Sequence, residues 1–340
     1  MALNDLPTMI RHLSRRLFLP YPMAPKADMR GKTVIVTGAS PGSIGYESAK
    51  TLAAWGAKVI VTARRNPHLI ADRIRQELAS VNPTAKLDAF PLDVTQPQSV
   101  QEFADWFRTT HGNRLDVLLN NAGVHLDLLG DWKSPHLSAD GFELHWRTNF
   151  LGPLQLTFAL LPLLQRTGRE TGDARVIYVA SHLHQKAINS ELFGASRPYN
   201  SWTAYGISKL GLVHCAFEIQ RRFAAADHVQ GFALHPGSVY TNIASLGLGQ
   251  HPLLKKIRNL LAPVEKRILL TPVQGAQTSI LCASQPGLQG GRYFERCAVA
   301  TPSTETQDSA VAERLWQETQ RWTQGLAIET ITSGEADCHV

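Results

Sequence analysis

From residue 32 onward, short runs rich in β-branched and aliphatic residues alternate with longer stretches in which apolar and polar residues recur at helical spacing. The runs that predict strands are 32–38, 58–65, 86–94, 115–123, 174–181 and 229–237. The stretches that predict helices are 47–57, 67–80, 97–110 and 203–226. This alternation is typical of βαβ units, in which helices cover both faces of a parallel sheet. We therefore predict a single doubly wound α/β domain over residues 31–325.

The two ends of the chain do not continue this alternation. In the N-terminal extension, residues 1–30, apolar residues recur at helical spacing beside arginines. They are Leu6, Ile10, Leu13 and Leu17, with Arg11, Arg15 and Arg16. Two interpretations are open, a basic amphipathic helix that contacts a membrane surface or an extension that packs on the domain or frays, and we favour the second. We expect residues 326–340 to form a mobile C-terminal tail.

Composition narrows the class of protein. The 340 residues are 44% hydrophobic, which is enough for a full core, and no stretch predicts a transmembrane helix or a signal peptide. The formal charge of +6 suits an anionic cofactor or a membrane surface, but no basic stripe or reader motif indicates nucleic-acid binding. Four scattered cysteines without zinc spacing indicate neither a disulfide framework nor a metal site, so we expect a reducing, cytoplasmic location.

The first predicted strand runs into the glycine-rich stretch TGASPGSIG, residues 37–45, and a helix follows. This is the context of a phosphate-binding turn, because glycines let the backbone approach a pyrophosphate and the helix N-terminus offers free N–H groups. Glycine turns between strand and helix are also common in plain α/β scaffolds, so the motif by itself is weak. The prediction of a cofactor turn depends on what else the chain places beside it.

Four more motifs follow later strands or lie on the long helix: LLNNAGV, YVAS, TAYGISK and HPGSVYT. Each alone has a structural explanation, since a Tyr and a Lys four apart are usually a surface pair and an Asn pair is usually a turn. Together and in this order they resemble the short-chain dehydrogenase/reductase family over residues 31–324. The stretches DGFELHWRTNFLGPLQLTFALLPLL, TPVQGAQTSILCAS and SAVAERLWQET resemble its retinol dehydrogenase, WW-domain oxidoreductase and protochlorophyllide oxidoreductase members.

The resemblance implies a Rossmann-type fold and hydride transfer between nicotinamide and a carbonyl or carbinol carbon. It makes Tyr205 the acid/base. Lys209, one helical turn away, is expected to lower the pKa of the phenol and to bind the nicotinamide ribose. Ser181 is expected to donate a hydrogen bond to the substrate oxygen. Asn149 matches the family asparagine that supports a water chain to the lysine.

The resemblance also assigns cofactor contacts. Besides Tyr205 and Lys209, they are Gly38, Ser40, Gly42, Ser43, Ile44, Gly45, Arg64, Arg65, Asp93, Val94, Asn120, Ala122, Gly123, Pro236, Gly237, Val239 and Thr241. The glycine turn is one residue longer than the family pattern TGxxxGxG, so either Gly42 or Ser43 takes its middle position. The second predicted strand ends in Arg64 and Arg65 with no acidic residue, which favours NADP(H) over NAD because an arginine fork binds a 2′-phosphate.

Two long loops, 125–140 and 182–202, and the leucine-rich segment 242–270 predict a deep pocket for a lipophilic carbonyl or alcohol. A core-packing or membrane-touching role for that segment stays open. Two alternative functions are also open: C=C reduction on the same scaffold, and an NADP(H)-binding sensor or interaction protein without turnover. An intact Ser-Tyr-Lys-Asn set argues against the sensor. Assembly into a homo-oligomer through the long helices is a further expectation from the family.

Overall fold

One mixed sheet organises the protein. The computed structural model describes residues 20–194, 198–239 and 269–332, and it contains one eight-stranded sheet. The strands are β1 (Thr33–Val36), β2 (Lys58–Ala63), β3 (Leu87–Pro91), β4 (Val117–Asn120), β5 (Ala174–Val179), β6 (Val229–His235), β7 (Arg292–Glu295) and β8 (Ala298–Ala300). The first six confirm the strands predicted from the sequence.

The strand order is β3-β2-β1-β4-β5-β6-β7-β8, and every neighbouring pair is parallel except β7 and β8. The chain leaves β1 in one direction across the sheet and returns to the other side at β4, so the point between these two strands is a topological switch. Ligands bind at such points, outside the carboxyl ends of the strands. The sequence reading missed β7 and β8, which are only four and three residues long.

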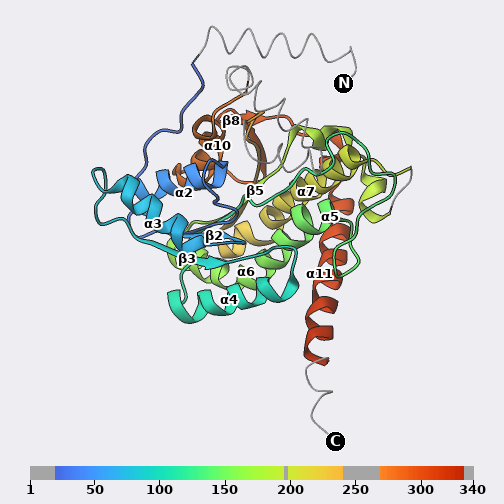
Figure 1. Ribbon diagram of the computed structural model, residues 1–340, viewed down its shortest axis with the longest axis horizontal. Helices are drawn as coiled ribbons and strands as arrows, with labels where there is room; N and C mark the ends of the chain where they lie inside the picture. The colour runs from blue at the N-terminus through green and yellow to red at the C-terminus, as the bar shows by residue number, and fades with distance from the viewer. Residues whose placement is uncertain (1–19, 195–197, 240–268, 333–340) are drawn as a thin grey trace, which may run out of the picture.

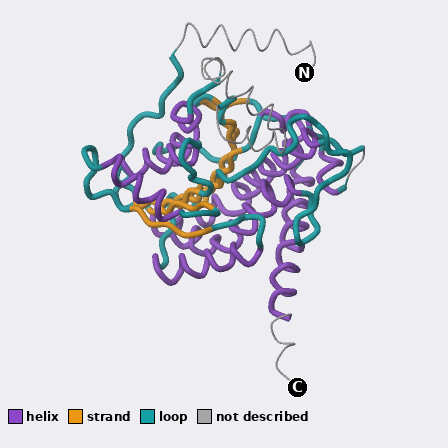
Figure 2. Tube along the Cα trace, in the orientation of Figure 1, coloured by secondary structure: helices purple, strands orange, loops and turns teal. Residues whose placement is uncertain are grey.

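Helices cover both faces of the sheet (Figure 1). One face carries α2 (Ile44–Ala54), α3 (Pro67–Leu78) and α10 (Pro272–Ser284), and the other carries α4 (Pro97–His111), α6 (Gly152–Thr171), α7 (Ser201–Asp227) and α11 (Ser309–Thr332). Short pieces complete the set: α5 (Leu144–Trp146), the π-helix η2 (Arg147–Leu151), and the 3₁₀ turns η3 (His182–Lys186), η4 (Asn189–Phe193) and η5 (Thr304–Gln307). This confirms the predicted doubly wound architecture, and Figure 2 shows the strands enclosed between helices.

Local signals at the helix starts fix where two functional segments begin. The side chain of Ser43 accepts a hydrogen bond from the Tyr46 amide and caps α2, which therefore begins three residues before the predicted start at 47. Asn200 caps α7 through the amides of Trp202 and Thr203, and the helix begins at Ser201, two residues before the prediction. Both caps lie at the carboxyl edge of the sheet.

At both ends, the structure differs from the predicted boundaries at residues 30 and 325: described residues before 31 pack on the domain, and the last helix extends beyond 325. Residues 20–30 lie against the domain: Ala24 and Met29 are buried, and the Ala24 amide donates to Gln277 in α10. This agrees with the favoured interpretation for that part of the extension, while the predicted basic helix lies outside the described residues. Helix α11 continues to Thr332, so the start of the expected tail is helical. In the described part of the chain, no helix is long and apolar enough to cross a membrane.

Candidate active site

A cavity of about 650 Å³ opens at the carboxyl ends of β1, β2, β4 and β5. The predicted site residues that line it are Gly38, Ser40, Ser43, Ile44, Arg64, Asp93, Val94, Ala122, Gly123, Tyr205, Lys209 and Pro236. The predicted residues that do not line it are Gly42, Gly45, Arg65, Asn120, Asn149, Ser181, Gly237 and Val239. Thr241 and most of the leucine-rich segment 242–270 lie outside the described residues. One cavity thus joins the glycine turn to the Tyr205 and Lys209 pair.

The glycine turn ends at Ser43, where helix α2 begins. Ser43 is the N-cap of α2, its hydroxyl donates to the Gly38 carbonyl at 3.2 Å, and it lines the cavity together with Ile44. Gly42 has φ +76° with open space beside it, a backbone conformation that favours glycine. At Gly45 a Cβ atom would lie 2.8 Å from the Gly38 oxygen, so Gly45 serves helix packing behind the turn.

Two polar side chains that the sequence reading did not single out hold the turn in place. The Asn121 side-chain amide donates to the carbonyls of Thr37 and Gly38, at 2.8 and 3.2 Å. The Thr37 hydroxyl accepts from the amides of Asn121 and Ala122. By contrast, Asn120 in β4 is buried and donates to Thr157 of α6, away from the cavity, because successive strand residues alternate between faces. Asn121, the next residue of the NNAG motif, lines the cavity where we expected Asn120.

Tyr205 and Lys209 lie on α7 and face the cavity together. The Lys209 ammonium is 5.5 Å from the centre of the Tyr205 ring and donates to the Val179 carbonyl at 2.9 Å. Ser181 follows β5, and its hydroxyl acts on the phenol as a hydrogen-bonding neighbour that lowers the pKa of Tyr205. The structure therefore brings together the three side chains that the sequence analysis grouped as Ser-Tyr-Lys.

The pKa shifts of this pair correct one expectation. Burial raises the pKa of Tyr205 from 10.0 to about 12, and the Ser181 hydroxyl only partly opposes this change. Burial also lowers the pKa of Lys209 from 10.5 to about 7. We expected the lysine cation to lower the pKa of the phenol, but the loss of water around each group is the largest cause of its shift. In the protein alone, Tyr205 is a neutral proton donor at physiological pH.

Asn149 lies behind the pair, in the π-helix η2 between α5 and α6. Its side-chain amide pairs with the backbone of Val124 in both directions, accepting at 2.7 Å and donating at 2.9 Å, and also donates to Ser208. A Cβ atom at Gly123 would lie 3.1 Å from the Asn149 side-chain oxygen and 3.3 Å from the Lys209 nitrogen. A glycine at position 123 therefore lets the segment after β4 approach both the Asn149 oxygen and the Lys209 nitrogen. The π-helical turn that carries Asn149 is of a kind that is frequent at functional sites.

The far end of the cavity lies beside β2 and β3. Arg64 lines it there and Arg65 does not, although both follow the same strand. The Asp93 carboxylate, after β3, accepts from the amide and the hydroxyl of Thr95, and both residues line this cavity. Among the described residues that line this end, Arg64 is the only arginine or lysine.

The loop after Ser181 is fixed to the C-terminal part of the chain. The carbonyl of Ser181 accepts from His184 Nδ1 at 2.7 Å, and His184 Nε2 accepts from the Ser303 amide at 3.0 Å. Burial lowers the pKa of His184 to about 4, which keeps the ring neutral. Both ring nitrogens are engaged, so His184 is a bridge between two backbone segments.

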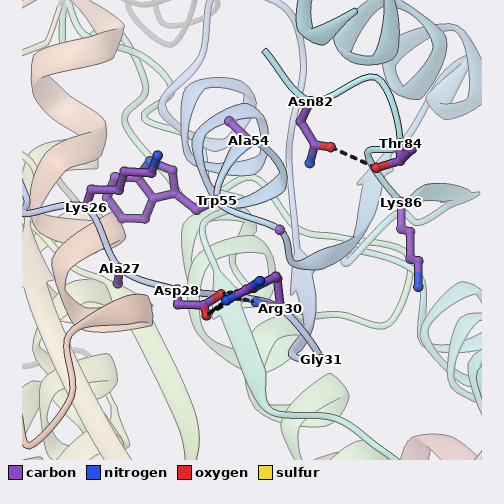
Figure 3. A pocket seen from close by; sticks show the side chains of 11 residues that line it. Lys26, Ala27, Asp28, Arg30, Gly31, Ala54, Trp55, Asn82, Thr84 and Lys86 are labelled. Atoms are coloured by element: carbon purple, nitrogen blue, oxygen red, sulfur yellow. Dashed lines mark hydrogen bonds and ion pairs between the residues drawn. The ribbon is translucent and has the colours of Figure 1, made fainter.

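A second and larger hollow, of about 750 Å³, lies at the opposite, amino end of the strands (Figure 3). It is lined by Lys26, Trp55, Asn82 and Lys86 among others, and its Asp28 and Arg30 side chains bind each other. Most of these side chains are exposed, and Tyr205, Lys209 and the glycine turn are not among its lining residues. The cavity with the chemistry is the one at the carboxyl edge.

Known proteins of the same fold and sequence pattern place this chain in a family. Residues 32–247 match the short chain dehydrogenase family model. The chain is 34% identical to human retinol dehydrogenase 14 over 306 residues, covering 85% of each protein, and 34% identical to mouse polyprenol dehydrogenase, covering 96% of this chain and 92% of that protein. A solved structure of an uncharacterized protein from Mycobacterium Paratuberculosis is 27% identical, with a TM-score of 0.63, and the match covers 88% of this chain and 95% of that one. The protein is a member of the short-chain dehydrogenase/reductase family of oxidoreductases.

Proposed function

We propose that this short-chain dehydrogenase/reductase is an NADP(H)-dependent enzyme that interconverts a carbonyl and an alcohol on a bulky lipophilic substrate, with Tyr205 as the acid/base. The observation that carries the proposal is the single cavity that runs from Arg64, past the glycine turn, to Tyr205 and Lys209. A nucleotide cofactor with a phosphate at one end and a reacting ring at the other needs such a continuous site.

The residues present fit a dinucleotide. The N-terminus of α2 meets the cavity at Ser43 and Ile44, where free backbone amides and the positive end of the helix dipole suit a pyrophosphate. Arg64 would pair with a 2′-phosphate, and β2 ends without the acidic residue that would bind a free ribose hydroxyl pair. When bound, NADP(H) supplies or accepts the hydride.

The chain itself supplies the proton. Because burial raises the pKa of Tyr205 to about 12, the phenol holds its proton and can donate it to a developing alkoxide in the reductive direction. Ser181, beside the phenol, would hold the substrate oxygen. Lys209 has a pKa near 7, so a bound anionic group would recruit the proton that makes it a cation.

Two observations support a lipophilic substrate. The two long loops at 125–140 and 182–202 expose large apolar side chains, Leu129, Leu137, Ile188 and Trp202. Burial of apolar ligand area there is favourable by about 25 cal/mol per Å² before binding costs. The relatives at 34% identity are named for retinol and polyprenol, both lipophilic alcohols, which is an argument by analogy. Contact of the N-terminal segment with a membrane, and homo-oligomer formation, stay predictions.

The test combines a substrate panel with one variant. Purified protein is assayed for NADPH and NADH consumption with retinal, steroid and polyprenal carbonyls, and with short sugars and hydroxy acids. We expect lipophilic carbonyls and NADPH to give the highest kcat/KM. Tyr205→Phe should lower turnover by at least about 100-fold with little change in NADPH affinity. Tyr46→Phe, a tyrosine on α2 bonded to Glu77, is the matched control and should stay active.

Each alternative function has its own outcome in this experiment. A saturated C=C bond in the product would identify a reductase of double bonds. NADPH binding without turnover of any compound would support the sensor interpretation. Full activity of Tyr205→Phe would refute the assignment of the acid/base, and a wide advantage for polar substrates would refute the lipophilic pocket.

A further inference from the structure

We infer that His125, which follows the NNAG motif, is a positioning residue for Tyr205: its ring covers one face of the phenol and fixes the direction in which the hydroxyl points. The two rings are stacked, with centroids 4.1 Å apart and an angle of 14° between their planes. His125 is not among the described residues that line the cavity, and its contact at the site is the stack on Tyr205. This inference rests on the proposed role of Tyr205 as the acid/base.

A second aromatic ring, that of Trp202, packs against His125. The Trp202 ring meets the imidazole edge-on, with centroids 4.6 Å apart at 80°, and the Trp202 indole nitrogen donates to the Leu128 carbonyl. The histidine is buried, with 8% of its surface exposed, and its Nε2 atom is buried with no hydrogen-bond partner among the described residues. An imidazole enclosed in this way has no room to rotate, so the stacked phenol is restricted too.

A second histidine fixes the backbone under the stack. His145 is fully buried and meets the Tyr205 ring edge-on, with centroids 6.2 Å apart. Its Nε2 accepts from the Leu126 amide at 2.9 Å, so the proton is on Nδ1, which donates to Glu143 at 2.7 Å. Because Leu126 follows His125 in the chain, this bond holds the segment that carries the stacked imidazole.

Burial, together with two charged or titratable neighbours, keeps His125 neutral. Burial is the main cause that lowers its pKa to about 3, and His145 and Lys209 act in the same direction, against the weaker effect of Asp127. The imidazole therefore carries no charge across the pH range in which an enzyme of this family works. What it provides to Tyr205 is a flat neutral surface that excludes water and restrains the ring.

The experiment separates this role from simple packing. His125→Leu keeps the bulk and loses the flat ring, and His125→Phe keeps the ring and loses the nitrogens. His136→Ala removes an exposed histidine that stacks on Trp132 in the same loop, so it is the matched control. The readouts are kcat and KM for NADPH-dependent reduction of retinal, and the ultraviolet titration of the Tyr205 phenolate, obtained as the difference from the same protein carrying Tyr205→Phe.

We expect His125→Leu to lower kcat about tenfold or more with KM for NADPH changed less than about twofold, since a misplaced acid slows the chemical step. The titration midpoint of Tyr205 should fall by about one pH unit as water reaches the ring. His125→Phe should restore both readouts, and His136→Ala should change neither. If His125→Leu does not fold, Trp202→Leu, at an exposed position, should shift the same two readouts in the same direction.

Wild-type values of kcat and titration midpoint in His125→Leu, or equal damage in His125→Phe, would overturn the inference. Failure of the proposed function is recognised separately, by full activity of Tyr205→Phe. If retinal is not reduced, the phenolate titration of the same variants decides the question of the stack without turnover.

Discussion

Replacing Lys209 with methionine should stabilise the free protein at neutral pH while it damages cofactor binding. The lysine is 4% exposed, and burial lowers its pKa from 10.5 to about 7. Folding must therefore remove a proton from an amine that holds it firmly in the unfolded chain. Methionine has a similar length and no charge, so the buried space stays filled and this cost disappears.

The size of the effect follows from the difference in pKa. At pH 7 it corresponds to a penalty of about 4–5 kcal/mol, as an upper limit, because one pKa unit is about 1.4 kcal/mol. Loss of the hydrogen bond to the Val179 carbonyl offsets about 1–2 kcal/mol. We expect a net gain of about 1–3 kcal/mol in the free energy of unfolding, or about 2–4 °C in Tm for a chain of this length.

The sign of the pH dependence is the sharper test. The folded state holds the lysine with a lowered pKa, so the penalty is full below pH 7 and disappears above about pH 10.5. Urea denaturation of wild type and Lys209→Met at pH 7 and pH 10 should therefore show a gap that narrows at the higher pH. Lys133→Met, at an exposed lysine, should change stability by less than about 0.5 kcal/mol. A destabilised Lys209→Met, or a gap that does not vary with pH, would refute the reasoning.

Three further predictions concern the cofactor turn and the serine loop. Arg64→Glu should weaken NADPH binding about tenfold or more and change NADH binding little, because Arg64 lines the cavity. Arg65→Glu should leave the binding of both nucleotides unchanged, because Arg65 is not among the lining residues. A fluorescence titration in which Arg64→Glu weakens both nucleotides equally would disprove this. Gly45→Ala should cost about 1–3 kcal/mol in urea denaturation and weaken NADPH binding, because its Cβ would lie 2.8 Å from the Gly38 oxygen and push the turn. His184→Phe should destabilise the protein at pH 7 by about 1–2 kcal/mol, because the Ser303 amide loses its partner and the Ser181 carbonyl keeps only its bond from the backbone amide of residue 184. The difference in stability between wild type and His184→Phe should narrow as the pH falls from 6.5 to 4, because the lowered pKa of His184 makes the wild type lose stability over this range. A difference in urea midpoints that stays constant over this pH range would contradict the prediction.

The sheet was largely predictable because its signals are local. The runs over β1, β2, β4 and β5 are continuous apolar segments, and the described strands are fully or almost fully buried. The pair β7 and β8 was not predictable in the same way, since its seven residues include exposed positions and its stability comes from pairing with β6. The helical start of the expected tail was missed because strong tertiary packing of α11 begins far upstream.

Part of the candidate site could be predicted from the sequence in the same way, and part could not. Residues at strand ends and on one face of α7 could be placed from the sequence, because parallel strands end at one edge and residues four apart share a helix face. Asn121 was adjacent to a predicted residue and was still missed, since its role is to bind the backbone of the glycine turn. His125 and His145 gave no signal, because lone histidines are usually satisfied core residues and their partner Tyr205 is far away in the chain.

Burial is the common cause of the two ionisation shifts on α7: it favours the neutral form of both groups, so it raises the pKa of the phenol and lowers the pKa of the amine. It keeps Tyr205 protonated and brings Lys209 close to neutrality. A surface pair of the same residues would stay near its ordinary pKa values, and its lysine would be charged whether or not a ligand was bound. The cost of keeping a lysine in this place is met by the apolar packing of α7 against β5 and β6, whose described core residues are almost fully buried. The stability of the sheet is thus what allows the site to hold a lysine whose charge depends on what binds beside it.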